Sequence, residues 1–125
     1  MEAKKILVID DEAPFVNVVK RIIESRSSYR VFTATDGQTG LKLARSEKPD
    51  LILLDIVMPG MSGSDVAEDL LEDPLTRDIP IIFVTAVISK DEIGGSGGML
   101  GNRTFIAKPI VADELMAKIN KLFSQ

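Results

Sequence analysis

The chain of 125 residues contains no cysteine, no histidine and no tryptophan. Without cysteine there is no disulfide and no thiol nucleophile, and without histidine there is no imidazole acid-base catalysis and no histidine-ligated zinc. Phosphohistidine chemistry on this chain is excluded for the same reason. The chemistry that remains open is that of carboxylates, hydroxyls and lysine.

Long hydrophobic runs and clusters of basic residues are also missing. The first apolar run, 6–9, is short and ends on acids, so the start of the chain is neither a signal peptide nor a membrane span. The net charge of -4 argues against direct binding of nucleic acid, which depends on clustered lysine and arginine. We therefore expect a cytoplasmic protein with no direct nucleic-acid partner and no membrane partner.

Short runs rich in Ile, Val and Leu recur along the chain. They are continuous rather than alternating, which is typical of strands buried on both faces of a parallel sheet. They lie at 6–9, 31–34, 51–54, 81–84 and 105–107. Helical patterns separate them, the clearest over 15–23, where Pro14 suits a first helical turn. The pattern predicts an α/β fold: a doubly wound, five-stranded parallel sheet in the order 2-1-3-4-5, with helices on both faces.

Five of the nine glycines lie between Gly94 and Gly101, a composition typical of a linker between domains. The 24 residues that follow, 102–125, are too few to fold alone without a disulfide or a metal. We therefore expect a single domain over 1–125. Five glycines would cost a helix roughly 4 to 5 kcal/mol, so the fourth crossover should be short or irregular, with a helix confined to about 89–93.

Side chains with carboxylate, hydroxyl or ammonium groups lie where the predicted strands end. Asp10 and Asp11 follow the first strand, Asp55 the third, Thr85 the fourth and Lys108 the fifth. In doubly wound sheets the functional crevice lies at the carboxyl ends of the strands. One acid there is commonly a helix cap, but three on adjacent strands cannot all ionise without a counter-charge.

Three carboxylates, a hydroxyl and an ammonium form a set that suits phosphate chemistry. Carboxylate oxygens are ligands for Mg²⁺, which usually completes its coordination with phosphate oxygens and water. Thr85 and Lys108 could then bind the oxygens of a phosphoryl group. Because no histidine, cysteine or serine stands at these strand ends, Asp55 is the group best placed to attack phosphorus.

Four motifs carry a resemblance that spans almost the whole chain. They are VIDDE at 8–12, LILLDIVMPGMSG at 51–63, VTA at 84–86 and FIAKP at 105–109. In this order and spacing they resemble the receiver domain of bacterial two-component response regulators, which has a flavodoxin-like fold and includes the chemotaxis regulators.

The resemblance implies a role for each matching residue. Asp55 would accept a phosphoryl group from a histidine kinase or phosphotransfer protein. Mg²⁺ would be bound by Asp11, Asp55 and the carbonyl of Val57, with Asp10 acting through water. Thr85 and Lys108 would hold the phosphoryl oxygens.

The resemblance also implies a switch. Phe105 would turn inward as Thr85 moves toward the phosphate, and the Lys108–Pro109 peptide would be cis. The face made by the fourth helix, fifth strand and fifth helix would control an output protein or a fused effector domain. The domain would assist its own phosphorylation and dephosphorylation without being a turnover enzyme. We expect no effector module after the last predicted helix of this sequence, which is either a stand-alone receiver or one domain of a longer protein.

Four other functions are weighed against this one. A flavodoxin-like FMN carrier needs phosphate-binding donors in the first loop, where this chain has DDEAP at 10–14. A dinucleotide-binding domain needs G-x-G-x-x-G there. A phosphatase of the haloacid dehalogenase type would carry the motif D-x-D at its nucleophile, whereas this chain has Val57 two residues after Asp55. A pseudo-receiver, which binds a protein partner without phosphate, usually lacks one of the acids or the lysine.

Two further hypotheses concern the surroundings of the site. Valine cannot orient water, so Val57 and Val87 predict a long-lived aspartyl phosphate, unless these valines simply pack. The glycine-rich segment, 93–101, lies between Thr85 and Lys108 and so cannot separate two domains. We expect phosphorylation to order it, unless it is an inert loop.

Overall fold

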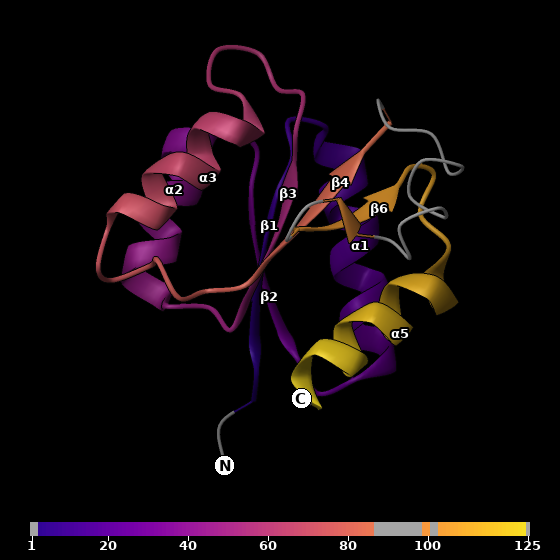
Figure 1. Cartoon of the computed structure of the whole chain (residues 1–125). Helices are drawn as coiled ribbons and strands as arrows, with labels where there is room; N and C mark the ends of the chain where they lie inside the picture. Colours follow the sequence, from indigo (N-terminus) through magenta and orange to yellow (C-terminus); the bar gives the residue numbers. More distant parts are fainter. Residues whose placement is uncertain (1–2, 87–98, 101–102, 125) are drawn as a thin grey trace.

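The fold was obtained as a computed structural model that describes residues 3–86, 99–100 and 103–124 (Figure 1). Strands and helices alternate along most of the chain. The strands are β1 (Lys5–Ile9), β2 (Arg30–Ala34), β3 (Leu51–Asp55), β4 (Ile81–Thr85), β5 (Met99–Leu100) and β6 (Arg103–Ala107). The helices are α1 (Ala13–Arg26), α2 (Gly37–Glu47), α3 (Gly63–Glu72) and α5 (Ala112–Phe123).

All six strands form one sheet in the order β2-β1-β3-β4-β6-β5. The five longer strands are parallel and follow the predicted order, with β6 as the predicted fifth strand. The prediction lacked β5, which pairs antiparallel with β6 through Met99 and Leu100. Two apolar residues beside glycines are too short a run to show a strand period, so this edge strand could not be read from the sequence.

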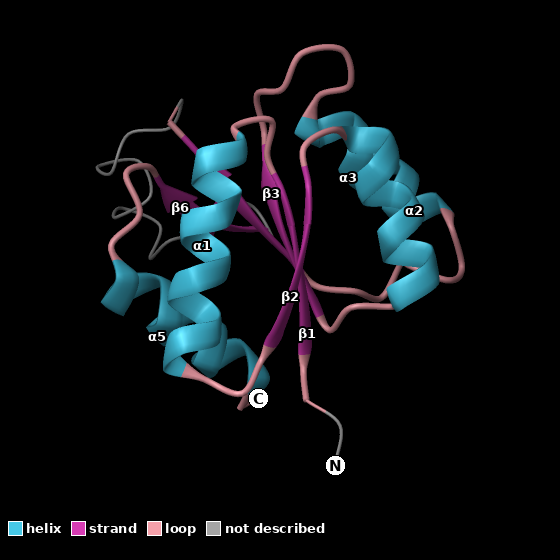
Figure 2. Cartoon of the chain, turned by 180° about the vertical axis from the view of Figure 1, so that it is seen from behind, coloured by secondary structure: helices cyan, strands magenta, loops and turns pink. Residues whose placement is uncertain are grey.

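Both faces of the sheet are covered by helices, as predicted (Figure 2). Because successive strand residues point to opposite faces, Ile6 and Val8 pack with α1 and α5, whereas Leu7 and Ile9 pack with α2 and α3. Every residue of β3 is buried. This double burial explains why the strands appear as continuous apolar runs in the sequence.

The helices begin at local sequence signals. Pro14 lies in the first turn of α1, and the Asp36 side chain caps α2 by accepting the N–H of Thr39 at 2.7 Å. A capping box of Ser62 and Asp65 starts α3. None of the helices within the described ranges is long and apolar enough to cross a membrane.

The outer edge of β2 is met by a side chain rather than by another strand. Glu24, which lies on α1, accepts a hydrogen bond from the backbone N–H of Val31 at 3.0 Å. Helix α1 is also joined to α5, through an ion pair of 2.6 Å between Arg26 and Asp113. The first contact joins α1 to the edge strand β2, and the second joins it to α5.

Several sequence hypotheses fall outside the described residues. They are the short helix over 89–93, the role of Val87 and the ordering of the glycine-rich segment, of which only Met99 and Leu100 are described. The segments on either side of the gap do come together, because the N–H of Lys108 donates to the carbonyl of Thr85 at 3.0 Å. Residues before and after the glycine-rich segment therefore belong to the same region of the sheet.

Candidate functional site

The predicted site residues lie at the carboxyl edge of the sheet, each at the end of its strand. Asp55 is the last residue of β3 and Thr85 the last of β4, while Asp10 and Lys108 directly follow β1 and β6. The parallel register places Asp55 beside Val84 on the neighbouring strand. Strand pairing alone therefore brings together groups that are far apart in the sequence.

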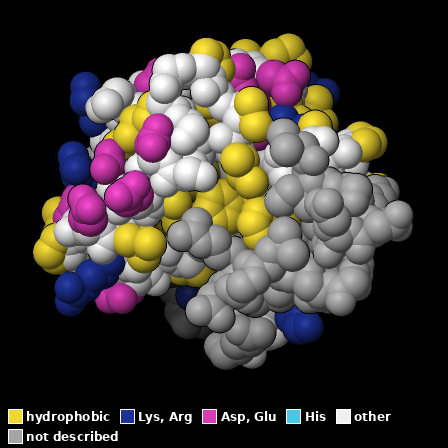
Figure 3. Space-filling view, turned by 45° about the horizontal axis from the view of Figure 1, so that its top comes forward, with side chains coloured by type: hydrophobic (Ala, Val, Ile, Leu, Met, Phe, Trp, Pro, Cys, Tyr) yellow, Lys and Arg dark blue, Asp and Glu magenta, His cyan; other side chains and the backbone are white. Residues whose placement is uncertain are grey.

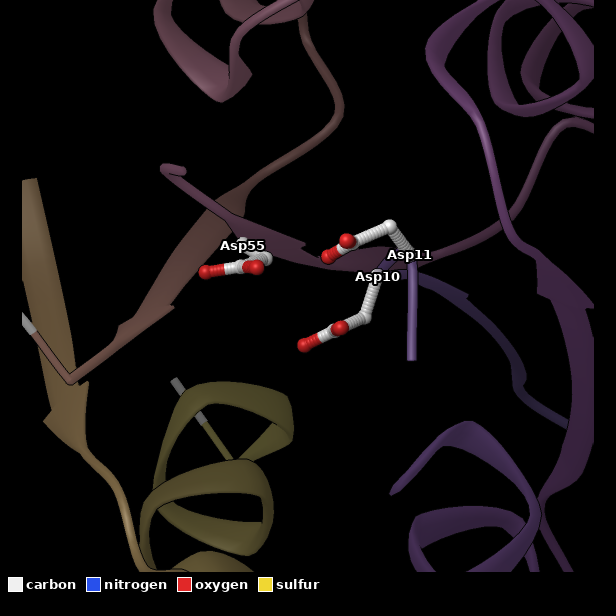
Figure 4. Close-up of side chains that lie close together, drawn as sticks. All are labelled: Asp10, Asp11 and Asp55. Atoms are coloured by element: carbon white, nitrogen blue, oxygen red, sulfur yellow. The ribbon is translucent and has the colours of Figure 1, made fainter. Parts of the chain in front are cut away.

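Three carboxylates converge at this edge (Figure 4). One oxygen from each of Asp10, Asp11 and Asp55 lies within 4.8 Å of the others. Asp10 and Asp55 are buried, with 1% and 5% of their surface exposed, whereas Asp11 is exposed. Asp10 accepts the backbone N–H of Glu12 at 2.9 Å and Asp55 accepts that of Val57 at 3.4 Å. The backbone thus orients two of the three acids.

Lys108 supplies the positive charge of the site. Its ammonium lies 2.8 Å from Asp10 Oδ2, 2.9 Å from Glu12 Oε1 and 3.8 Å from Asp55 Oδ2. Burial alone would lower the pKa of Lys108, but the contacts with Asp10 and Glu12 outweigh burial and raise it. The side chain therefore stays an ammonium across the physiological range.

The carboxyl group of Asp55 is held in an unfavourable setting for a charge. Burial is the main cause that raises its pKa to about 6, with the negative charge of Asp10 adding to it and Lys108 opposing it. At neutral pH most molecules still carry the carboxylate, which is the form that can act as a nucleophile. A cation among the acids would relieve the remaining repulsion, and the hard oxygen donors fit Mg²⁺.

A pocket of about 270 Å³ opens beside these groups. Its walls include Asp11, Asp55, Thr85 and Lys108, and Val57 lies at its rim with 57% of its surface exposed. In the view of Figure 3, with the top of Figure 1 brought forward, hydrophobic side chains gather in the middle of the face. The donors predicted for a phosphoryl group thus line one cavity, and its rim at Val57 is apolar.

Phe105 and Pro109 flank the site. The Phe105 ring is buried, with 8% of the residue exposed, and stacks on Phe83 with 5.3 Å between ring centroids. The Lys108–Pro109 peptide is cis. The ring lies inside the fold on the strand next to Thr85.

Two residues of the site escaped the sequence analysis. Glu12 contacts Lys108, yet a glutamate just before a helix is usually a solvated residue. Gly63 ends the matched motif at 51–63, but the need for glycine there was not predicted: a Cβ on this residue would clash with the backbone carbonyl oxygen of Asp55. The Gly63 N–H also donates to Ile56 at 2.8 Å. A close approach of this kind depends on the folded backbone, so no local sequence signal could reveal it.

Comparison with known proteins places this site in a family. The family model of the response regulator receiver domain matches residues 6–120. The chain is 39% identical over 122 residues to the response regulator PleD of Caulobacter vibrioides, covering 94% of this chain but 26% of PleD. It is 34% identical to protein PilH of Pseudomonas aeruginosa, covering 96% of this chain and 98% of PilH.

The fold agrees with the same assignment. The receiver domain of the sensor histidine kinase PA1611 from Pseudomonas aeruginosa, solved with a magnesium ion in its active site cleft, superposes with a TM-score of 0.81 at 23% identity. That structure matches 99% of this chain and 100% of its own. The chain spans about a quarter of PleD and nearly all of PilH. It belongs to the response regulator receiver domain family.

Proposed function

We propose that this chain is the phosphoacceptor of a two-component phosphorelay and that Asp55 carries the phosphoryl group. The observation that supports this most directly is the position of the Asp55 carboxylate, which is buried in a pocket with two further acids and an ammonium. A carboxylate oxygen of Asp55 would form a bond to phosphorus as the phosphorus–nitrogen bond of a donor phosphohistidine breaks. The donor imidazole leaves and takes up a proton.

Mg²⁺ is the proposed cofactor. Asp11, Asp55 and the backbone carbonyl of Val57 would hold the ion, with Asp10 acting through water. When bound, it neutralises negative charge on the phosphoryl oxygens and on the acids. PA1611, whose receiver domain shares this fold, has a magnesium ion in its active site cleft, and that finding supports the assignment.

The remaining roles follow from the pocket. The Thr85 hydroxyl would donate to a phosphoryl oxygen and the Lys108 ammonium would pair with another, since both residues line the cavity. Thr85 and Phe105 would form the switch that changes the surface made by β6 and α5. We expect a cytoplasmic protein that receives phosphate from a histidine kinase or phosphotransfer protein and acts on an output protein or a fused effector domain.

The two competing functions have less support. A pseudo-receiver would be expected to lack an acid or the lysine, and here Asp10, Asp11, Asp55 and Lys108 are all present and assembled. A phosphatase of the haloacid dehalogenase type is expected to carry a second aspartate two residues after the nucleophile. This chain has Val57 at that position. We therefore propose a phosphoacceptor that is not a turnover enzyme.

The test is phosphorylation by a small phosphodonor in the presence of Mg²⁺, followed by mass spectrometry. The wild type should gain the mass of one phosphoryl group, and Asp55→Asn should gain none. Beryllofluoride should shift peaks in the nuclear magnetic resonance spectrum of the wild type and leave the spectrum of Asp55→Asn unaltered. An equal response from both proteins would contradict the assignment of Asp55.

A further inference from the structure

The side chain of Glu12 does not cap α1. It is the residue before the first helical turn, and its side chain makes no capping hydrogen bond. Glutamate is not among the preferred residues at this position, where serine, threonine, aspartate and asparagine satisfy the free N–H groups. Its carboxylate instead lies 2.9 Å from the Lys108 ammonium, although 63% of the Glu12 side chain is exposed.

Besides the buried Asp10, whose Oδ2 lies 2.8 Å from the Lys108 ammonium, two groups at the start of α1 contact that ammonium. Besides Glu12, the ring of Phe15 lies under the ammonium, which is 4.3 Å from the ring centroid. Asp55 Oδ2 lies 3.8 Å from the ammonium, farther than Glu12 Oε1 at 2.9 Å. In this arrangement the lysine is closer to Glu12 than to the proposed phosphoacceptor.

The Glu12–Lys108 pair lies at the boundary between two cavities. Both residues line the pocket of about 270 Å³ that contains Asp55, and both also line a groove of about 530 Å³ along α1. The walls of that groove include Phe15, Val18 and Ile110. A change in the pair would therefore alter the polar pocket directly.

We propose that Glu12 is a positioning residue that competes with phosphorylated Asp55 for the Lys108 ammonium. The inference rests on the proposed function, because it assumes that Lys108 contacts the phosphoryl group. Before phosphorylation, Glu12 and Phe15 hold the ammonium on the α1 side of Asp10, which stays in contact with it. After it, the ammonium moves to the phosphoryl oxygens, and the contact with Glu12 is the interaction given up.

The proposal predicts the direction in which the affinity for beryllofluoride changes. Removing the Glu12 carboxylate should favour the state in which Lys108 contacts a phosphoryl group. Since Glu12 is largely exposed, the effect should be of the size of a surface ion pair, about a two- to fivefold gain in affinity for beryllofluoride at saturating Mg²⁺.

A simple change of charge must be separated from competition for Lys108. Glu12→Gln removes the charge, whereas Glu12→Asp keeps it but shortens the side chain by one carbon–carbon bond of about 1.5 Å. The backbone of Glu12 is fixed because its N–H donates to Asp10 at 2.9 Å, so the shorter carboxylate cannot follow the lysine. Glu68→Gln, at an exposed position on α3, is a matched control for the loss of one charge.

The experiment measures beryllofluoride affinity by titration and the initial rate of phosphorylation by a small phosphodonor. Both Glu12 variants should bind beryllofluoride about two- to fivefold more tightly than the wild type, while Glu68→Gln should match the wild type. A gain in Glu12→Gln with none in Glu12→Asp would mean charge repulsion alone and would overturn the proposal. So would an unchanged or weaker affinity in Glu12→Gln.

A second measurement does not depend on phosphorylation. In the protein without phosphodonor, nuclear Overhauser contacts between the Lys108 side chain and the Phe15 ring should be present in the wild type and weakened in Glu12→Gln. Unaltered contacts in that variant would show that Glu12 does not hold the lysine. If Asp55→Asn responds to beryllofluoride like the wild type, the proposed function fails, whereas equal contacts in wild type and Glu12→Gln disprove the role of Glu12.

Discussion

The amino ends and the carboxyl ends of the parallel strands carry charge in different ways. At the amino end, Lys5 and Asp50 exchange two hydrogen bonds, of 2.9 and 2.7 Å, and Lys5 forms a partly exposed ion pair with Glu47 at 3.6 Å. At the carboxyl end, Asp10 and Asp55 are buried and share one ammonium.

The difference is one of balance. The amino-end charges are paired and partly hydrated, so they join β1 to the start of β3 without stored repulsion. Among the described residues, the carboxyl-end acids are shielded from water and outnumber the cation beside them, which is why the pKa of Asp55 is raised. The charges at the amino end stabilise the fold. Those at the carboxyl end carry an excess of negative charge, which a bound cation can balance next to a phosphoryl group.

The largest effect should come from breaking the backbone that supports the carboxyl edge. Gly63→Ala would place a Cβ against the Asp55 carbonyl and should lower the free energy of unfolding by about 3 kcal/mol or more. Gly60→Ala is the control: Gly60 has a φ of 80° but open space around it, so it should cost about 1 to 2 kcal/mol. Urea denaturation checks both, and equal losses would contradict the close approach at Gly63.

Replacing the lysine at each end should lower the free energy of unfolding by clearly different amounts. Without Mg²⁺, Lys108→Met leaves the buried acids without a counter-charge and should cost about 2 to 4 kcal/mol of unfolding free energy. Lys5→Met removes a partly exposed pair and should cost less than about 1 kcal/mol. Addition of Mg²⁺ should recover part of the loss in Lys108→Met, and equal costs for both variants would remove the contrast.

Neutralising Asp55 should stabilise the metal-free protein. Its pKa is about 6 in the fold against an ordinary 3.8, so the folded state holds this proton more tightly than the unfolded state. The associated stability is full below about pH 4 and is lost as the pH rises through 6. Asp55→Asn should therefore be about 1 to 3 kcal/mol more stable than the wild type at pH 7.5, with the gain fading toward pH 4.

The matching acid at the amino end is the control for this gain. Asp50→Asn replaces the charged acceptor of the Lys5 N–H by a neutral amide oxygen, so it should be neutral or destabilising by up to about 1 kcal/mol. Denaturation at several pH values without Mg²⁺ provides the comparison. A stabilised Asp50→Asn, or a destabilised Asp55→Asn, would show that the two ends do not differ as described.

The smallest effect concerns the apolar rim of the pocket. Val57 cannot orient water, so Val57→Asn should speed the loss of phosphate from Asp55 severalfold, without a large change in stability because the side chain is 57% exposed. Decay of the phosphorylated protein, followed by mass, measures this rate. An unchanged decay would favour a packing role for Val57.

The five parallel strands could be located because each is buried on both faces and appears as an apolar run, and their alternation with helices predicted the doubly wound order. The rule that strand ends form the crevice then located Asp55, Thr85 and Lys108. Strand β5 was missed because two residues carry no period. The close approach at Gly63 and the contact of Glu12 depend on where distant parts of the backbone meet, and neither has a local pattern in the sequence.

The side chain of Glu24 has a consequence for how the molecule behaves beside other copies of itself. An open strand edge presents free N–H groups that can pair with another chain and begin aggregation. At the β2 edge the Val31 N–H is already bonded to Glu24, and the carboxylate adds a charge that an incoming strand would have to displace. At the opposite edge, β5 is only two residues long. The β2 edge is therefore a poor template for strand addition at Val31, and β5 offers an incoming strand only two residues.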